Sequence, residues 1–314
     1  MTTNINTPMG NWRITPPLDI ARSHAPTAEY KGKLYIFGGG GPNFQSLNSS
    51  VCYDPTADKW STITDMPTLR SGAMTTTFED KIYVMGGGFR QENGTFVFLK
   101  TVDIYCPQSD SWTKGPDMIQ PHDYPAVAVL GGHIYILGGH HPDATLGGPK
   151  TDPGFDFCER LNPTTNEWEA IAPLSTPRFA LSAVVHGGKI LAMGGVAFRP
   201  EGFNNFTVIE AYDPLTNTWF IDPDFALPWP AAGLGAAILN DQLYIFGGYS
   251  DDDIHHRTST YNFASQTWQA CTTMPAPVAA MGVNVCQDRI YSVGGWADDG
   301  RTPINTVYSF GLDD

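Results

Sequence analysis

The chain has 314 residues, among them 33 Gly and 25 Pro, and only 16% are charged. So many helix-breaking residues exclude helical bundles and helical solenoids. With 18 Lys and Arg against 32 Asp and Glu, the formal charge is −14, and so negative a surface repels nucleic-acid phosphates and anionic lipid headgroups. We therefore expect neither nucleic acid nor a membrane as a partner.

The N-terminus and the cysteines indicate the compartment. The first residues, MTTNINTPMGNW, contain neither a basic start nor an apolar stretch, and no uncharged apolar run reaches membrane-spanning length. The five cysteines are an odd number without any C-x-x-C pair, which favours reduced thiols over a disulfide framework or a zinc site. Both observations predict a cytoplasmic protein.

An apolar run that ends in a glycine pair recurs along the whole chain. The six copies are LYIFGG to Gly39, IYVMGG to Gly87, IYILGG to Gly139, ILAMGG to Gly195, LYIFGG to Gly248 and IYSVGG to Gly295. Each is typical of a buried strand that stops at glycine. A second run and a tryptophan follow in five of the six units, at Trp60, Trp112, Trp168, Trp219 and Trp268.

A period of about 50 residues with a Gly-Gly strand, a Tyr-containing strand and a Trp resembles the kelch repeat. The resemblance covers essentially the whole chain. It implies an all-β fold, a six-bladed β-propeller with four-stranded antiparallel blades. We expect residues 1–9 to form an N-terminal tail and residues 10–314 to form a single propeller domain.

Trp12 supplies the tryptophan that the sixth repeat lacks. It precedes Gly39 by 27 residues, the same interval that separates Trp60 from Gly87. The strand around Trp12 is therefore expected to complete blade 6 and to close the ring between the two ends of the chain. The recurring Gly, Tyr and Trp residues are interpreted as scaffold packing.

Loop lengths predict which face of the propeller is functional. If the strands of a blade are lettered a to d from the axis outwards, the b–c loops and d–a connections share one face. The a–b and c–d turns on the other face are short and repetitive, whereas nearly all length variation lies in the b–c loops. Irregular loops on a rigid scaffold usually carry binding and chemistry, so we expect the site on the b–c/d–a face.

Basic side chains are predicted at the mouth of the central channel on this face. Ten residues beyond the Trp that precedes each of blades 1 to 4, the sequence places Arg22, Arg70, His122 and Arg178. Guanidinium groups suit carboxylate, phosphate or enolate oxygens. The ligand is therefore expected to carry an anionic group.

Groups that titrate near neutrality at the mouth predict acid–base chemistry. The candidate catalytic residues are His24, His122, Asp123 and Tyr124. The candidate ligand-binding residues are Arg22, Arg70, Arg178, Phe179, Phe89, Arg90, His140, Phe198, Tyr249 and Trp296. Since no catalytic-serine elbow, P-loop or dinucleotide fingerprint is present, we expect isomerisation, elimination or cyclisation without a cofactor.

A metal site is an alternative on the fifth b–c loop. Asp251 and His255, and likewise Asp252 and His256, have D-x-x-x-H spacing. Plant specifier proteins, kelch propellers that act on glucosinolate breakdown products, carry an E-x-x-x-D-x-x-x-H iron motif on such a loop. Here glycines stand where that motif has Glu, so an Fe(II)-dependent lyase is a minor alternative to a solvated charge run.

Two classes of function stay open at this point. One is a small molecule bound at the central mouth, and the other is an acidic peptide captured by the same face in a protein-interaction module. Many kelch domains bind proteins and are fused to an oligomerisation or ubiquitin-ligase module, for which we expect six blades over residues 10–314 to leave no room. Loops at 88–100, 140–157 and 196–206 that fold inward would favour the small molecule.

Overall fold

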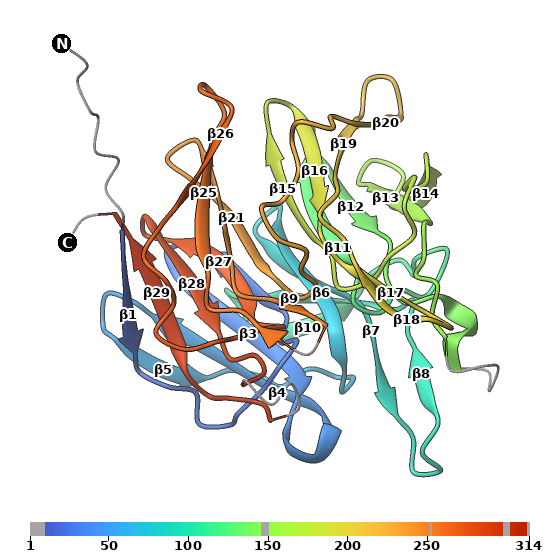
Figure 1. The fold of residues 1–314 in the computed structure, drawn as a ribbon. Helices are drawn as coiled ribbons and strands as arrows, with labels where there is room; N and C mark the ends of the chain where they lie inside the picture. The colour runs from blue at the N-terminus through green and yellow to red at the C-terminus, as the bar shows by residue number, and fades with distance from the viewer. Residues whose placement is uncertain (1–9, 146–150, 252, 298–301, 313–314) are drawn as a thin grey trace.

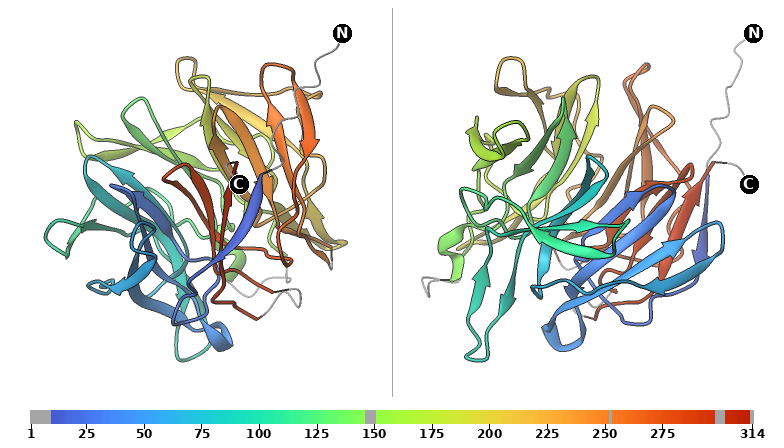
Figure 2. Two further views of the ribbon diagram at one scale, coloured as in Figure 1. Left: turned by 90° about the vertical axis from the view of Figure 1, so that its left-hand side faces the viewer. Right: turned by 180° about the vertical axis from the view of Figure 1, so that it is seen from behind.

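The computed structural model describes residues 10–145, 151–251, 253–297 and 302–312. Six antiparallel sheets form the blades of a propeller (Figures 1 and 2). Their inner strands contact one another in the cyclic order β2, β6, β11, β15, β21, β27 and back to β2. The predicted all-β, six-bladed propeller is therefore confirmed, while the expected tail, residues 1–9, lies outside the described residues.

Each blade contributes one strand to each of four concentric layers. The inner strands are β2 (Thr27–Tyr30), β6 (Ser71–Phe78), β11 (Ala126–Leu130), β15 (Ser182–His186), β21 (Gly235–Leu239) and β27 (Gly282–Cys286). The second layer is β3 (Lys33–Gly40), β7 (Lys81–Arg90), β12 (His133–Leu137), β16 (Lys189–Met193), β22 (Gln242–Phe246) and β28 (Arg289–Val293). The third layer is β4 (Ser46–Asp54), β9 (Val102–Cys106), β13 (Cys158–Asn162), β19 (Ile209–Asp213), β25 (Thr258–Asn262) and β29 (Val307–Gly311). The outer layer is β5 (Lys59–Thr62), β10 (Ser111–Lys114), β14 (Glu167–Ile171), β20 (Thr218–Ile221), β26 (Thr267–Ala270) and β1 (Asn11–Thr15).

Short extra elements lie in the b–c loops. They are η1 (Pro42–Phe44), β8 (Phe96–Phe98), η2 (Pro142–Thr145), β17 (Val196–Arg199), β18 (Gly202–Asn205), β23 (Tyr249–Ser250) and β24 (Asp253–Ile254). The strand β8 extends β7 into a hairpin that projects from the body of the propeller (Figure 1). No helix in the described part of the chain is long and apolar enough to cross a membrane.

Burial explains the apolar runs before the glycine pairs. The second-layer strands are covered on both faces by neighbouring blades, so residues such as Leu34, Ile36 and Phe37 of β3 are fully buried. A strand buried on both faces has no polar alternation. Outer strands such as β5 are mostly exposed, and polar residues accordingly surround their tryptophans.

The ring closes where the two ends of the chain meet. The strand β1 pairs antiparallel with β29, from Asn11 opposite Gly311 to Thr15 opposite Val307, and the two lie side by side in Figure 1. The Trp12 indole N–H reaches Thr258 Oγ1 at 3.1 Å in blade 5. The closure predicted from the spacing of Trp12 is thus confirmed.

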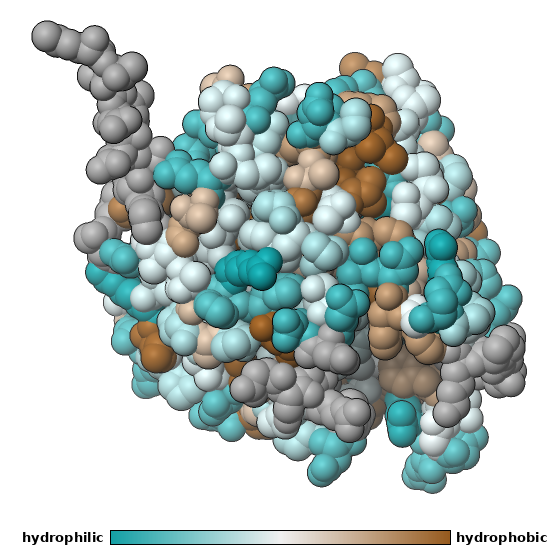
Figure 3. All heavy atoms as spheres, viewed as in Figure 1, coloured by the Kyte–Doolittle hydropathy of each residue, from teal (hydrophilic) through white to brown (hydrophobic). Residues whose placement is uncertain are grey.

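The outer wall of blade 4 differs from the other blades. Figure 3 shows a surface of mixed polarity, with apolar atoms gathered over the β19–β20 hairpin. Here Phe220 and Ile221 follow Trp219 and are exposed, whereas a polar residue follows the corresponding tryptophan of every other outer strand. An exposed apolar pair on an edge strand favours association.

Candidate functional site

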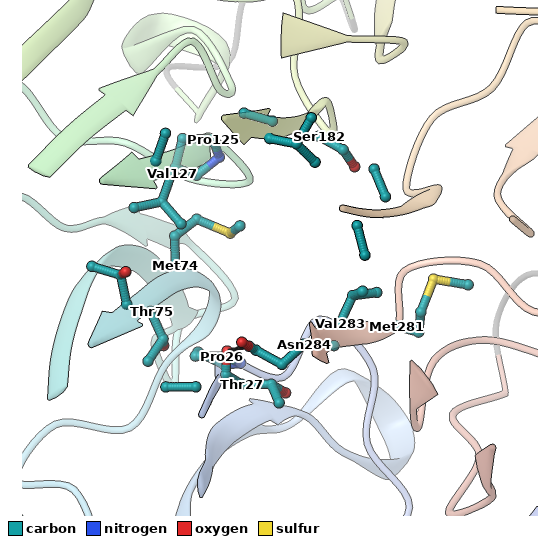
Figure 4. Close-up of a pocket in the computed structure, with 18 of the residues that line it drawn as sticks. Pro26, Thr27, Met74, Thr75, Pro125, Val127, Ser182, Met281, Val283 and Asn284 are labelled. Atoms are coloured by element: carbon teal, nitrogen blue, oxygen red, sulfur yellow. Dashed lines mark hydrogen bonds between the residues drawn. The ribbon is translucent and has the colours of Figure 1, made fainter. Parts of the chain in front are cut away.

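The inner strands enclose a cavity of about 520 Å³ along the propeller axis. Side chains from several blades surround its open centre in Figure 4, where the labelled ones are Pro26, Thr27, Met74, Thr75, Pro125, Val127, Ser182, Met281, Val283 and Asn284. Most are small or apolar, with a few hydroxyl and amide groups. A cavity of this size and lining suits a small molecule.

A ring of backbone hydrogen bonds surrounds the axis at the loop end of the cavity. One residue per blade has a left-handed φ between 47° and 67°, and these six are His24, Gly72, Tyr124, Ala180, Gly233 and Ala280. Five of their N–H groups donate to the carbonyl of the preceding blade's residue at 2.7–2.9 Å. A left-handed conformation costs a residue with a side chain roughly 1–2 kcal/mol, and these bonds offset that cost. We call this set the axial ring.

Six aromatic or imidazole side chains form a collar around the mouth at the axial ring. The ring of His24 lies 4.2 Å from that of Tyr124 and 4.4 Å from that of Trp296, centroid to centroid. Further contacts join Tyr124 to His140 and Trp296 to Tyr249. His140 stacks on Phe179 at 3.9 Å, and Phe179 and Tyr249 pack in one cluster.

This aromatic collar consists of side chains that were selected from the sequence, namely His24, Tyr124, His140, Phe179, Tyr249 and Trp296. They come from blades 1, 3, 4, 5 and 6. Gly72 of blade 2 has no side chain, which allows His24 and Tyr124 to meet across it. The cavity and the collar share His24 and Tyr124, so the collar is the rim of the channel.

His140 lies between two carboxylates at this rim. Its Nδ1–H donates to Asp152, and its Nε2 faces Asp123 Oδ2 at 3.9 Å. Asp152 also accepts hydrogen bonds from the backbone N–H groups of His141 and Gly154, at 3.1 and 2.9 Å. Burial raises the pKa of Asp152, but the hydrogen bond and charge of His140 outweigh it and lower this pKa overall. Asp152 therefore stays ionised and orients the imidazole.

Asp123 is buried without a full set of partners. Its side chain is 2% exposed, and Oδ1 has no hydrogen-bond partner among the described residues. Burial, followed by the negative charge of Asp152, raises the pKa of Asp123 well above its usual value. A carboxyl with a raised pKa beside an imidazole is a typical acid–base arrangement.

Two further titratable groups of the collar, His24 and Tyr124, are uncharged at neutral pH. Burial, with a contribution from the charge of His140, lowers the pKa of His24 to about 3. Burial and the charge of Asp123 raise the pKa of Tyr124. Both side chains therefore act as neutral walls and hydrogen-bonding groups.

The predicted ring of cations at the mouth is wrong. Arg22, Arg70, His122 and Arg178 are all buried, at most 1% exposed, and point between the blades. Arg70 forms an ion pair with Asp103 at 2.5 Å, and Arg178 forms one with Glu210. The charges of Arg70 and Arg178 are thus matched inside the scaffold, and the argument for an anionic ligand at the mouth loses its basis.

The glycine pairs explain why these side chains point into the scaffold and away from the mouth. The sheet ladder between β3 and β4 breaks at the glycine pair, which leaves second-layer carbonyls in need of donors. Arg22 donates to the Gly38 carbonyl at 3.0 Å and Arg70 to the Gly86 carbonyl at 2.9 Å. His122 takes the same place, with Nδ1 2.6 Å from the Gly138 carbonyl and Nε2 3.1 Å from Glu159.

Three further candidates lie outside the aromatic collar. Phe89 and Arg90 belong to the projecting β7–β8 hairpin, where Arg90 is exposed. The Phe198 ring packs on Phe203 of its own hairpin at 4.8 Å. Its backbone nevertheless supports the site, because Asp152 and Phe198 exchange two backbone hydrogen bonds.

Two residues of the site were missed from the sequence. Asp152 holds His140, and Phe98 stacks on the other side of the same imidazole at 5.7 Å between ring centroids. Both lie in variable loops without a repeat register. Position in the longest b–c loop was the one signal available for Asp152.

The alternative metal ligands do not converge in the described residues. His255 is buried, with Nε2 2.9 Å from Ser250 Oγ, while Asp251 and His256 are exposed. Asp252 lies outside the described residues. Within residues 10–145, 151–251, 253–297 and 302–312, no group of three or more His, Cys, Asp or Glu side chains could hold a metal ion.

Comparisons with known proteins agree with this architecture. A model of the KLHDC2/KLHL20/DRC7 kelch-repeats domain matches residues 10–195, and the kelch motif matches residues 177–225 and 230–275. The solved structure entitled "Structure of YjhT" superposes with a TM-score of 0.78 at 17% identity, covering 94% of this chain and 96% of that one. At this identity the likeness shows the fold alone.

Two curated relatives match most of the chain. The kelch-like protein terF of Aspergillus terreus is 31% identical over 79% of this chain and 55% of its own length. Beta-scruin of Limulus polyphemus is 28% identical over 82% of this chain and 29% of its own length. The chain thus spans about half of the first relative and less than a third of the second. Because a kelch model covers more than half of its residues, the chain belongs to the kelch-repeat family.

Proposed function

We propose that this propeller binds a small, partly apolar molecule in the aromatic collar and transfers protons there through His140 and Asp123. The observation that carries the proposal is the buried Asp123 carboxyl, whose Oδ1 has no partner, beside an imidazole at the rim of a cavity. A buried polar atom without a partner costs about 1–3 kcal/mol. Such a cost is typical of functional sites.

The residues of the site have distinct roles in this proposal. Asp152 accepts a hydrogen bond from Nδ1–H of His140 and so directs Nε2 towards Asp123. A proton removed from the ligand by one of these two groups can be returned by the other. Isomerisation, elimination and cyclisation all need such a removal and return, and the chain's own residues supply both steps.

The collar supplies the binding surface. Phe179, Tyr249 and Trp296 present apolar area with two polar edges, which suits a ligand of mixed polarity. The small axial-ring residues Ala180, Gly233 and Ala280 line the cavity beneath them. A ligand in the collar can therefore extend along the axis into the channel.

A ligand screen with site variants tests the proposal. Wild type, His140→Phe and Asp123→Asn are screened by thermal shift against a metabolite library, with Asp143→Asn, an exposed carboxylate of the same loop, as the control. Hits are expected to bind wild type and the control equally and to bind His140→Phe at least tenfold more weakly. Affinities are measured by calorimetry on variants whose circular dichroism is native.

Proton transfer has its own readout. Hits are incubated in D₂O, and exchange of their carbon-bound hydrogens is followed by NMR. Exchange is expected with wild type and should be lost in Asp123→Asn, which keeps the shape of the side chain but cannot exchange a carboxyl proton. A library without a hit that depends on His140, combined with peptides that bind the same face, would instead establish a protein-interaction module.

A further inference from the structure

The surroundings of the aromatic collar indicate the charge of its ligand. We propose that the collar binds an organic cation, a ligand with an alkylammonium or similar group held against the aromatic rings and near the two carboxylates. This inference rests on the proposed small-molecule site and adds the chemical class of the ligand. It reverses the expectation of an anionic ligand that the arginines suggested.

The first support is the ring of π faces. Ring contacts through the two histidines join Tyr124 to Trp296 and to Phe179, and a further contact joins Trp296 to Tyr249. Tyr249 also packs against the small cluster that contains Phe179. Aromatic faces carry negative electrostatic potential, and several faces around one space attract ammonium groups. His24 does not oppose this attraction, because burial, with a contribution from the charge of His140, lowers its pKa to about 3 and leaves it neutral.

The second support is the unmatched carboxyl beside the collar. Asp123 is buried and its Oδ1 has no hydrogen-bond partner within the described residues. This oxygen abuts Gly72 of the axial ring, because a Cβ on residue 72 would collide with it. Gly72 lines the cavity, so the buried Oδ1 lies directly behind the cavity lining at the rim of the channel. A cation bound at the rim beside Gly72 would provide the positively charged partner that the Asp123 carboxyl lacks.

The third support is the lack of a competing cation. Arg22, Arg70 and Arg178, each two residues before an axial-ring residue, are occupied between the blades. Burial, followed by the charge of Asp152, raises the pKa of Asp123, and among the described residues Asp123 and Asp152 form salt-bridge contacts with His140 and with no Lys or Arg. An anionic ligand would therefore meet the ionised Asp152 and the buried Asp123 carboxyl without a guanidinium to balance them, whereas a cation is also attracted by a chain of net charge −14.

His140 shows what kind of group this rim accommodates. Its imidazole stacks on Phe98 and Phe179 while both of its nitrogens face carboxylates. The protein thus already places one nitrogen-bearing group between aromatic planes and acids at this rim. The ligand's ammonium would lie in the same type of environment on the Trp296 side of the collar.

Three probes of one shape and different charge test the inference. Choline is compared with 3,3-dimethylbutan-1-ol, its neutral isostere, and with 3,3-dimethylbutanoate, using saturation-transfer NMR and calorimetry. We expect choline to bind at least fivefold more tightly than the alcohol, and the carboxylate to bind most weakly. The preference should fall at high salt, because part of it is electrostatic.

Site variants tie this preference to the collar. Trp296→Ala should weaken choline at least fivefold, and Asp123→Asn should reduce the preference for choline over the alcohol without weakening the alcohol. Tyr249→Leu is a second collar variant in case Trp296→Ala does not fold, and Asp143→Asn is the matched control. Equal or tighter binding of either isostere, or choline binding that ignores these variants, would overturn the cation inference.

The outcomes also separate the two proposals. If neutral or anionic library members bind in a His140-dependent manner while choline does not, the small-molecule site stands and the cationic class falls. If nothing binds in a manner that depends on His140, Trp296 or Asp123, both fall together.

Discussion

Replacing Glu210 by Gln should destabilise the propeller strongly, because Glu210 and its partner Arg178 are both buried. Glu210 and Arg178 are fully buried and form an ion pair, and Glu210 also accepts hydrogen bonds from the N–H groups of Ser175 and Thr176 at 2.9 and 3.1 Å. The substitution keeps the shape but leaves a buried guanidinium without its counter-charge. Breaking one partner of a buried pair costs about 3–5 kcal/mol.

This cost translates into a measurable shift of the melting temperature. An unfolding entropy of about 2.1 cal/mol/K per residue gives roughly 0.66 kcal/mol/K for 314 residues. We therefore expect Tm to fall by about 5–8 °C for Glu210→Gln in calorimetry. Urea unfolding of the same samples measures the free energy directly.

A double variant supplies the control. Arg178→Met combined with Glu210→Leu removes both charges and keeps similar volumes, and such replacements are often neutral or stabilising. We expect it to be more stable than either single variant, which is the signature of coupling. A Glu210→Gln protein within about 1 kcal/mol of wild type would refute the interpretation of Arg178 as a scaffold residue.

Three other substitutions probe the site and the closure. Because the pKa of Asp123 is raised above its ordinary 3.8, the folded protein holds this proton more tightly than the unfolded chain, and wild-type stability should fall as pH rises above about 4. Asp123→Asn should remove this slope, so its Tm relative to wild type should increase from pH 4 to pH 8; parallel profiles would contradict the burial argument. Gly72→Ala combines a φ of +67° with a collision against Asp123 and should cost about 1–3 kcal/mol in urea unfolding; an unchanged midpoint would show that the rim can relax. Trp12→Ala removes an indole that packs on Phe246 and Phe310 and should cost roughly 3 kcal/mol, whereas a loss below about 1 kcal/mol would argue against its role in closure.

Periodic features of the sequence predicted the fold well. The interval from Trp12 to Gly39 matches that of other blades, and it correctly placed β1 beside β29 because blade geometry repeats. Positions in the d–a connections were also informative, since His24, Tyr124 and Phe179 all reach the collar. The repeated sequence pattern therefore predicts the path of the backbone.

Side-chain direction was not predictable in the same way. Arg178 lies next to Phe179 in sequence, yet its side chain turns away from the mouth. It binds Glu210 and the Ala192 carbonyl inside the scaffold. These partners are distant in sequence and follow no period. Asp152 was missed for a related reason, since it reaches His140 from a loop whose path depends on its bridge to Phe198.

The pairing of β1 with β29 also sets the order in which the propeller can fold. Thr15 contacts Val307 across 292 residues of chain, so the first strand to emerge during synthesis stays without its partner until nearly all of the others exist. Closing so long a loop is entropically costly and slow. Until that moment blade 6 lacks its outer strand and Trp12 lacks Phe310, and the contact between blades 5 and 6 is incomplete. Blade 6 can therefore be completed only once β29 has been made, although its outer strand β1 precedes every other strand of the propeller.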